Sequence, residues 1–342
     1  MVKMDSKTRK SPYEKLKENI RFLLDQKEII EAAKERYITN VWTIKKLILL
    51  SRFIYPYLVI ATDKKQNGTY KYFNSWFYID LFSGPGASSI GGMFDIIGSP
   101  IVSLLKGIHY IDKREDYIRF TKWFFGDVNK DFCSALEKRR NKTLELIEQK
   151  HKVTIPKKDV HILPKDANKN IDTILNEIEK YEKISILAFI DPEGFTEIKW
   201  STLKKLFERK YVDIIYILST GGVKRGLRPE HLEKNLPPLS DSEKTKYLSG
   251  KYSCADLVEM FVKKILKELH RYRLFYYSIP IYNEKNTEIY RIVWTSCSKG
   301  AASSVENTIN FLQRIKNEDL FRTIQVVLGK QLELKDFLSK TD

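Results

Sequence analysis

An apolar run passes directly into a glycine-rich turn at residues 76–86, which read WFYIDLFSGPG. Aromatic and β-branched residues favour strands, so this run predicts a buried strand over 76–82. Gly84 and Gly86 follow at once, and glycine lets a backbone turn tightly and approach a ligand closely. The dinucleotide fingerprint GxGxxG is absent, because position 89 is serine. A hydride-transfer enzyme is therefore disfavoured.

Short apolar segments alternate with helical ones after this loop. Such alternation predicts a parallel sheet covered on both faces. Strands are expected over 76–82, 108–112, 160–163, 184–190 and 212–218. Helices are expected over 99–106, 115–125, 131–149, 169–180 and 201–208. A polar loop over 219–251 and a helix over 255–270 precede two last strands, 274–282 and 289–296, whose short connection permits only an antiparallel hairpin.

These elements predict an α/β, Rossmann-like fold with a seven-stranded, mostly parallel sheet and a terminal antiparallel hairpin. N-terminal helices are added, including one from Trp42 that Pro56 ends or kinks. We expect a helical segment over 1–70, a Rossmann-like domain over 71–220 and 271–342, and an insertion over 221–270. This strand plan resembles that of class I S-adenosylmethionine-dependent methyltransferases, whose sheet has one reversed strand.

Aspartates stand at or just after the ends of the expected strands, at Asp80, Asp112, Asp166 and Asp191. Because ligands of open parallel sheets bind outside the carboxyl ends of the strands, the carboxylates of the first, second and fourth strands should converge on one crevice. Asp112 is placed to accept both hydroxyls of a ribose. A helix cap is the alternative for that residue. Asp166 fits an acid that binds an adenine amine, or else a residue that caps the helix from 169.

The fourth expected strand ends in AFIDPEGF, residues 188–195. An aspartate followed by proline makes a rigid turn that presents a carboxylate and a backbone carbonyl, and a nearby aromatic ring could stack on a base. The segment resembles the DPPY-type motif of methyltransferases that act on exocyclic amines of adenine or cytosine. Glu193 replaces the second proline of that motif, and the aromatic residue comes one position late. Carbon-5 methylation of cytosine is disfavoured, because no cysteine is near. The candidate catalytic residues are Asp191, Pro192 and Phe195.

Several segments, taken in order, resemble the three-Cys-motif partner family. They are WTIK (42–45), DLFSGPG (80–86), GSP (98–100), FIDP (189–192), YRIV (290–293) and SKG (298–300), and the resemblance covers 41–315. It implies a methyltransferase-like fold, an S-adenosylmethionine site and a phage-type partner protein with a three-cysteine motif, and it supplies no substrate. The candidate cofactor-binding residues, from the strand ends and the glycine loop, are Asp80, Phe82, Gly84, Gly86, Asp112, Asp166 and Asp191.

The 342 residues include 60 basic and 44 acidic side chains, a net charge of +16 that no single tail explains. A distributed excess indicates an anionic partner, most often nucleic acid. The loop after the fifth strand, STGGVKRGLR (219–228), would border the crevice. Its Lys224, Arg225 and Arg228 could hold phosphates of DNA or RNA, a solvated basic loop being the alternative. The basic residues 138–140 and 204–205 are expected on solvated helix faces.

The three cysteines and five histidines show neither CxxC nor zinc-site spacing. The cysteines are odd in number and far apart in the sequence, which predicts a reducing, cytoplasmic location. The apolar stretch 47–61 carries Arg52 and Pro56 and is too short to span a bilayer. The N-terminal residues are basic without an apolar segment, so we expect no secretory signal.

The leading prediction is an S-adenosylmethionine-dependent methyltransferase that acts on nucleic acid, at an exocyclic amine or another base nitrogen. The altered DPEGF segment leaves a second reading open, a catalytically silent methyltransferase-like module that binds nucleic acid or a partner protein. A third reading is a metal-dependent nucleotide enzyme such as a nuclease.

Overall fold

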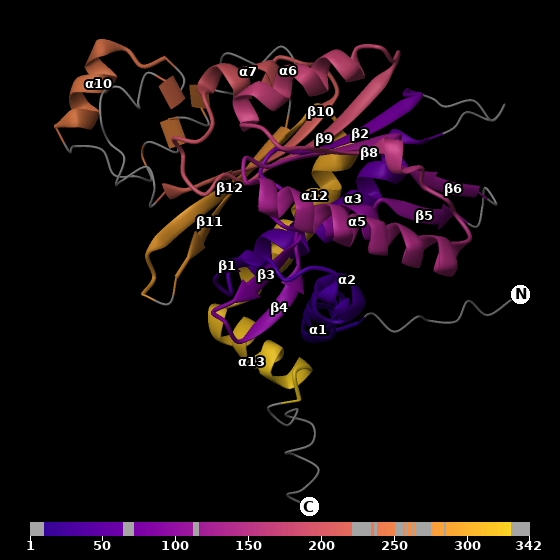
Figure 1. Cartoon of the computed structure of the whole chain (residues 1–342). Coiled ribbons are helices and arrows are strands. Elements are labelled where there is room, and N and C mark those ends of the chain that lie inside the picture. Colours follow the sequence, from indigo (N-terminus) through magenta and orange to yellow (C-terminus); the bar gives the residue numbers. More distant parts are fainter. Residues whose placement is uncertain are drawn as a thin grey trace, which may run out of the picture.

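The computed structural model describes residues 10–63, 72–111, 116–220, 234–235, 238–249, 256, 259–260, 263–264, 275–283 and 285–329. Its centre is a seven-stranded sheet with the order β11-β12-β10-β9-β2-β7-β8 (Figure 1). Only β12 runs antiparallel to its neighbours, and the remaining pairs are parallel. The expected mostly parallel sheet with a terminal hairpin is confirmed. Its strands are β2 (Ser75–Asp80), β7 (Lys122–Gly126), β8 (Val160–Leu163), β9 (Ile184–Ile190), β10 (Val212–Leu218), β11 (Phe275–Tyr282) and β12 (Glu288–Ser296).

The second strand of this sheet is β7, and the prediction that 108–112 takes that place is wrong. Strand β5 (Ile108–Ile111) instead pairs with β6 (Asp116–Arg119) in a separate antiparallel hairpin. The helix expected over 115–125 is replaced by β6 and β7. The physical reason is the aromatic content of this stretch, because Phe120, Trp123 and Phe125 are wholly buried and such residues favour strands.

Helices cover both faces of the sheet (Figure 1). One buried cluster joins α6 (Ala167–Ile178) and α7 (Trp200–Phe207) to the upper face, and a larger cluster joins the lower face to the other helices. Those helices are α1 (Pro12–Leu24), α2 (Lys27–Glu31), α3 (Thr43–Ala61), α4 (Ser99–Lys106), α5 (Lys130–His151), α12 (Lys299–Arg314) and α13 (Asn317–Val327). A short helix, α10 (Asp241–Leu248), lies within the expected insertion over 221–270.

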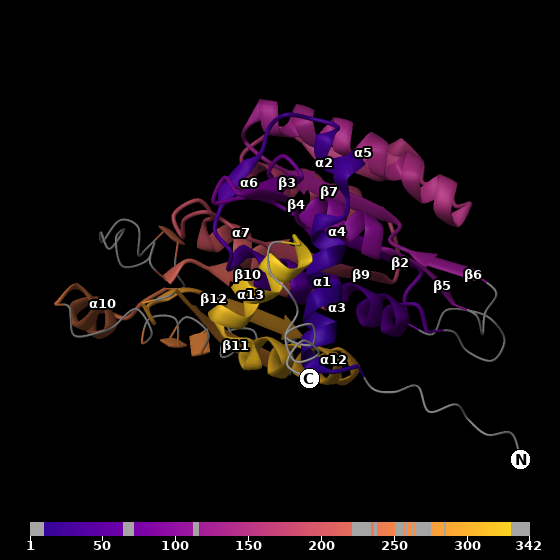
Figure 2. The ribbon, with the colours of Figure 1, turned by 90° about the horizontal axis from the view of Figure 1, so that it is seen from below.

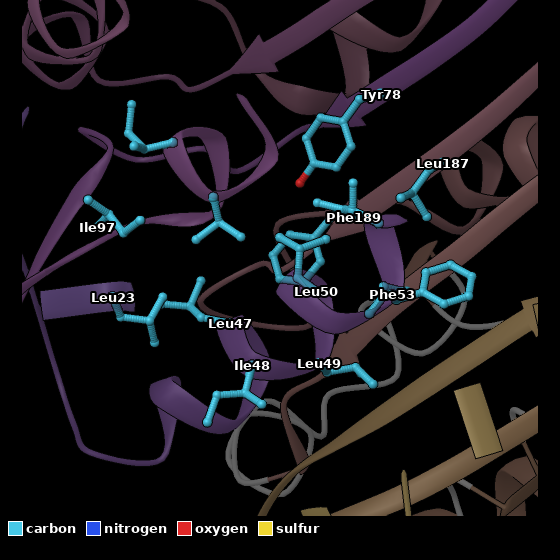
Figure 3. Packing of buried hydrophobic residues seen from close by; sticks show 14 of the residues in the cluster. Leu23, Leu47, Ile48, Leu49, Leu50, Phe53, Tyr78, Ile97, Leu187 and Phe189 are labelled. Carbon is cyan, nitrogen blue, oxygen red and sulfur yellow. The ribbon is translucent and has the colours of Figure 1, made fainter. Parts of the chain in front are cut away.

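Helix α3 is the centre of the lower layer. Its Leu50 and Phe53 are wholly buried and lie opposite Tyr78 and Phe189 of the sheet (Figure 3). Of the two expectations for Pro56, the one that it ends the helix is wrong, because α3 continues through it to Ala61. Two hydrogen bonds fix the part beyond the proline, one between Tyr57 and Ser185 (2.8 Å) and one from the Trp76 indole to Ala61 O (3.0 Å).

A three-stranded sheet lies beside the glycine loop. The loop leads into the hairpin β3 (Ala87–Ile90) and β4 (Phe94–Ile97), and β1 (Tyr37–Thr39) pairs with β3. Helices α1, α3 and α13 gather on the same side of the main sheet (Figure 2). Side chains of α1 belong to the same buried cluster as Tyr78 and Phe189, so the N-terminal helices share a core with the sheet. Among the described helices, none is long and apolar enough to cross a membrane.

Candidate functional site

The carboxyl ends of three neighbouring parallel strands form the candidate site. The register sets Asp80, the last residue of β2, beside Phe125 of β7 and Phe189 of β9. Two residues beyond those partners, the chain places Asp127 and Asp191. Three aspartates therefore stand at or directly after adjacent strand ends, at the edge where ligands of parallel sheets bind.

Asp127 occupies the position that the sequence analysis assigned to Asp112. It follows β7, the true second strand, whereas Asp112 lies outside the described residues. Its Oδ2 accepts the Gly84 N–H (2.9 Å), and its Oδ1 accepts the Asn129 N–H (2.8 Å). Burial raises the pKa of this carboxyl group above its usual value. Sequence reasoning missed Asp127 because it assigned 115–125 to a helix.

The two glycines of the loop differ in their surroundings. Gly84 has φ +58°, and a Cβ added there would meet no atom within 4 Å, so its backbone faces open space. Gly86 has φ +80°, and a Cβ there would lie 2.8 Å from Leu136 Cδ1 on α5. Gly86 is thus required by packing, while Gly84 can face a ligand. Phe82, between β2 and the glycines, is half-buried.

Asp80 is wholly buried and holds the loop from beneath. It accepts hydrogen bonds from Ser99 Oγ (2.6 Å) and the Phe82 N–H (3.2 Å), which join the strand end to the start of α4. Burial raises its pKa to about 7. The expectation of a direct cofactor contact is not met by this geometry, because the carboxylate has no exposed surface. Asp80 therefore supports the loop from within the core.

Arg139 of α5 is a second support of the glycine loop. The residue was expected on a solvated helix face, but it is wholly buried. Its guanidinium donates to Pro85 O (2.6 Å) in the loop and to the carbonyls of Ile30, Ala33 and Glu35 at 2.7–3.3 Å. Burial lowers its pKa to about 10, so it remains charged at neutral pH. A helical pattern of charges gives no signal for such a role.

Asp191 is bound by a lysine that the sequence analysis did not single out. Lys46 Nζ of α3 lies 2.7 and 3.0 Å from the two carboxylate oxygens. The same ammonium lies over the Tyr290 ring, 5.1 Å from its centroid. Tyr290 Oη donates to Trp42 O (2.6 Å). The segments 42–45 and 290–293 of the family resemblance therefore meet each other, and Lys46, one residue after the first of them, connects them to Asp191.

Acidic side chains gather around this edge. The pKa of Tyr37 on β1 is raised, mainly by burial and secondly by a hydrogen bond with Glu193. The Glu193 N–H in turn donates to Glu197 Oε2 (2.9 Å). The carboxylates of Glu193, Glu197, Asp127 and Asp191 give the edge a negative charge that Lys46 offsets in part, whereas the Tyr37 phenol is neutral. Within the described residues, no group of three histidine, cysteine or acidic side chains is placed to hold a metal ion.

Three other expected site residues are placed by the structure. Phe195 is 2% exposed and belongs to the upper core cluster, so it offers no ring face to a base. Pro192, next to Asp191, is buried. Asp166 caps α6 by accepting the Asn168 N–H (2.9 Å), which bears out the capping alternative. The proposed phosphate-binding residues Lys224, Arg225 and Arg228 lie outside the described residues.

No family model matches this sequence, and no curated protein matches it. Among solved structures, the chain is similar to the crystal structure of protein LPL1258 from Legionella pneumophila str. Philadelphia 1, of the family DUF519. The identity is 10% and the TM-score 0.41, and the match covers 78% of this chain and 91% of that one. The three-Cys-motif partner family thus stays a resemblance of short segments.

Proposed function

We propose that this protein is an S-adenosylmethionine-dependent methyltransferase that acts on nucleic acid. The observation that carries the proposal is the strand order. Numbered along the chain, the seven strands lie in the order 6-7-5-4-1-2-3, with only strand 7 reversed. This plan resembles the class I methyltransferase sheet, and the glycine loop follows its first strand. The cytoplasmic location and the phage-type partner protein remain expectations from the cysteine pattern and the family resemblance.

The residues at the carboxyl edge suit the cofactor in charge and leave space beside Gly84. S-adenosylmethionine carries a sulfonium and an ammonium group, which suit an edge rich in carboxylates. Asp127 is the candidate for the ribose hydroxyls, because it follows the second strand of the sheet. Gly84 leaves open space for a ligand beside that carboxylate. The cofactor would supply an activated methyl group.

Asp191 is the candidate for orienting the amine that receives the methyl group. An ionised carboxylate has about four acceptor positions, so it can bind Lys46 and still accept an N–H from an acceptor amine. Lys46 would keep the carboxylate facing the crevice, and the rigid Asp191–Pro192 turn would hold the neighbouring carbonyl. The amine nitrogen, with its hydrogens bound, would direct its lone pair at the methyl group.

Calorimetry with S-adenosylmethionine tests the cofactor site. We expect binding by the wild-type protein and at least a tenfold loss with Asp127→Asn, because hydrogen bonds to charged groups are worth roughly 1.5–3 kcal/mol. Asp172→Asn, on the exposed face of α6, is the matched control and should bind like wild type. Absence of binding by wild type, or unchanged binding by Asp127→Asn, would refute the proposal.

A catalytically silent module is the second candidate, favoured by two observations. The Asp191 carboxylate is already paired with Lys46, and the expected stacking ring of Phe195 lies in the core. Transfer of a labelled methyl group to total RNA or DNA separates the two functions. The enzyme should label one of these pools, and Asp191→Asn should abolish the label. Cofactor binding without any label would favour the silent module.

A further inference from the structure

A groove of about 790 Å³ opens next to the candidate site. It lies between the first turn of α3, the end of β11 and the start of α13, and its lining includes Lys45, Tyr282, Asn283, Asn317, Phe321 and Arg322. Lys45 and Lys46 are consecutive on α3, so their side chains diverge by about 100° around the helix axis. Lys46 binds Asp191, while Lys45 lines the groove. The first turn of α3 therefore separates the groove from Asp191.

Lys45 is a buried cation without an acidic partner. It is 7% exposed, and its ammonium donates to Ile315 O (3.1 Å) and Asn317 Oδ1 (2.9 Å). Both partners are neutral, and an ammonium has three hydrogens to donate. In the ranges that the structure describes, no ion pair involves Lys45. Burial lowers its pKa, which is the expected response of a desolvated ammonium. A bound anion would relieve this unfavourable burial.

Two more cations line the groove. Lys316 and Arg322 are exposed, and neither has an ion pair among the described residues. Among the described residues of the lining, Glu318 is the acidic side chain. The groove is therefore positively charged, in contrast to the acidic edge on the other side of α3. This separation of charge suits a ligand whose phosphate must stay away from Asp191.

Aromatic rings complete the lining. Tyr282 is 40% exposed and Phe321 is 41% exposed, although both are large apolar side chains that would gain from burial. Exposed rings beside basic side chains are the pattern by which proteins bind single strands, because bases stack on the rings while cations contact the backbone. A duplex satisfies this pattern poorly, since its bases already stack on one another.

We infer that this groove binds a nucleotide of a single-stranded nucleic acid, with its phosphate at Lys45, Lys316 and Arg322 and its base against Tyr282 or Phe321. That this nucleotide flanks the base to be methylated rests on the proposed function. That the groove binds a single strand does not rest on it. The inference also assigns part of the +16 net charge to a particular surface.

Fluorescence anisotropy with labelled 12-nucleotide RNA and DNA single strands, and with the matching duplex, tests the inference. Arg322→Gln and Lys45→Met should each weaken single-strand binding about tenfold. Each should also lower the slope of log affinity against log salt by about 0.7. Tyr282→Ala should weaken binding about fivefold or more. Lys158→Gln, an exposed lysine in the 3₁₀ turn η2 (Lys157–Asp159) before β8, is the control and should bind like wild type.

Three results would overturn the inference. They are variant affinities within twofold of wild type, a duplex bound more tightly than the single strand, and adenosine monophosphate bound as tightly as the 12-mer, which would indicate a free nucleotide. Arg322→Gln and Tyr282→Ala alter exposed side chains, so they keep the test valid if Lys45→Met fails to fold. Cofactor calorimetry on the same variants should match wild type. Loss of strand binding together with absent cofactor binding would refute the methyltransferase and retain the groove.

Discussion

Asp80, beneath the glycine loop, makes the stability of the fold depend on pH. Its pKa is about 7 in the folded protein, against an ordinary value of 3.8, because the carboxyl group is buried. Between these two values the folded state holds a proton that the unfolded state has released. The free energy of unfolding therefore falls as pH rises through this window, and the contribution of the protonated form is fully present only below it.

We expect Asp80→Asn to remove this dependence, since an amide of the same shape does not titrate. The slope of unfolding free energy against pH should differ from wild type by up to about 1.4 kcal/mol per pH unit between pH 4 and 7. Urea unfolding at several pH values measures it. Asp172→Asn should keep the wild-type slope. Equal slopes for wild type and Asp80→Asn would contradict a buried, protonated carboxyl group at this position.

The Lys46–Asp191 pair predicts strong coupling between two residues far apart in sequence. Both side chains are mostly buried, at 14% and 21% exposed. Lys46→Met should lower the free energy of unfolding by about 1–3 kcal/mol, because it leaves the carboxylate without its cation. Adding Asp191→Asn should restore part of the loss. A double-mutant cycle by urea unfolding measures the coupling, and additivity within about 0.5 kcal/mol would exclude the pair.

At the scale of elements, α5 connects the glycine loop to the N-terminal segment through one side chain. Arg139 donates only to backbone carbonyls, on residues 30–35 and on Pro85. Removing it takes the guanidinium donor away from Pro85 O and Ile30 O, whereas Ala33 O and Glu35 O keep the Arg36 guanidinium as a partner. Each lost partner of a buried carbonyl costs about 1–3 kcal/mol. Packing of α5 thus fixes where the loop backbone lies.

Arg139→Met should destabilise the protein by about 3 kcal/mol or more and weaken S-adenosylmethionine binding, because the loop loses its anchor. Arg139→Lys should recover little, since one ammonium cannot reach four carbonyls. The neighbouring Lys138→Met changes an exposed side chain and should be near neutral. Urea unfolding and calorimetry give the two readouts. A stable Arg139→Met variant with wild-type cofactor affinity would show that the loop does not depend on α5.

At the scale of the whole molecule, the cofactor should stabilise the fold by mass action. A ligand that binds only the folded state adds about 2.7 kcal/mol at a concentration one hundred times its Kd. We therefore expect S-adenosylmethionine to raise the Tm by several degrees, and to do so far less for Asp127→Asn at the same concentration. Differential scanning calorimetry checks this. An unchanged Tm at saturating cofactor would contradict the proposed site.

Local sequence patterns predicted most of the helices and strands. At the candidate site they predicted the glycine loop and Asp191. Strands β8, β9 and β10 and helix α4 have the bounds that apolar runs and the Ser-Pro start predict. The glycine loop and Asp191 were visible because a strand followed by a turn is a local signal. Local patterns predict an element correctly where its burial matches its composition, as when an apolar run becomes a buried strand.

Tertiary structure alone decided the rest. Residues 116–126 carry charges at a helical spacing, yet burial of their aromatic rings makes them strands, and this exchanges Asp112 for Asp127. Lys46, Arg139 and the groove at Lys45 depend on contacts between α3, α5, α13 and the sheet. The position of Phe195 after the strand predicts a stacking ring, but the side chain lies in the core. A sequence specifies which side chains can bind or pack, but only the folded chain decides which charges lose their water and which partners they meet.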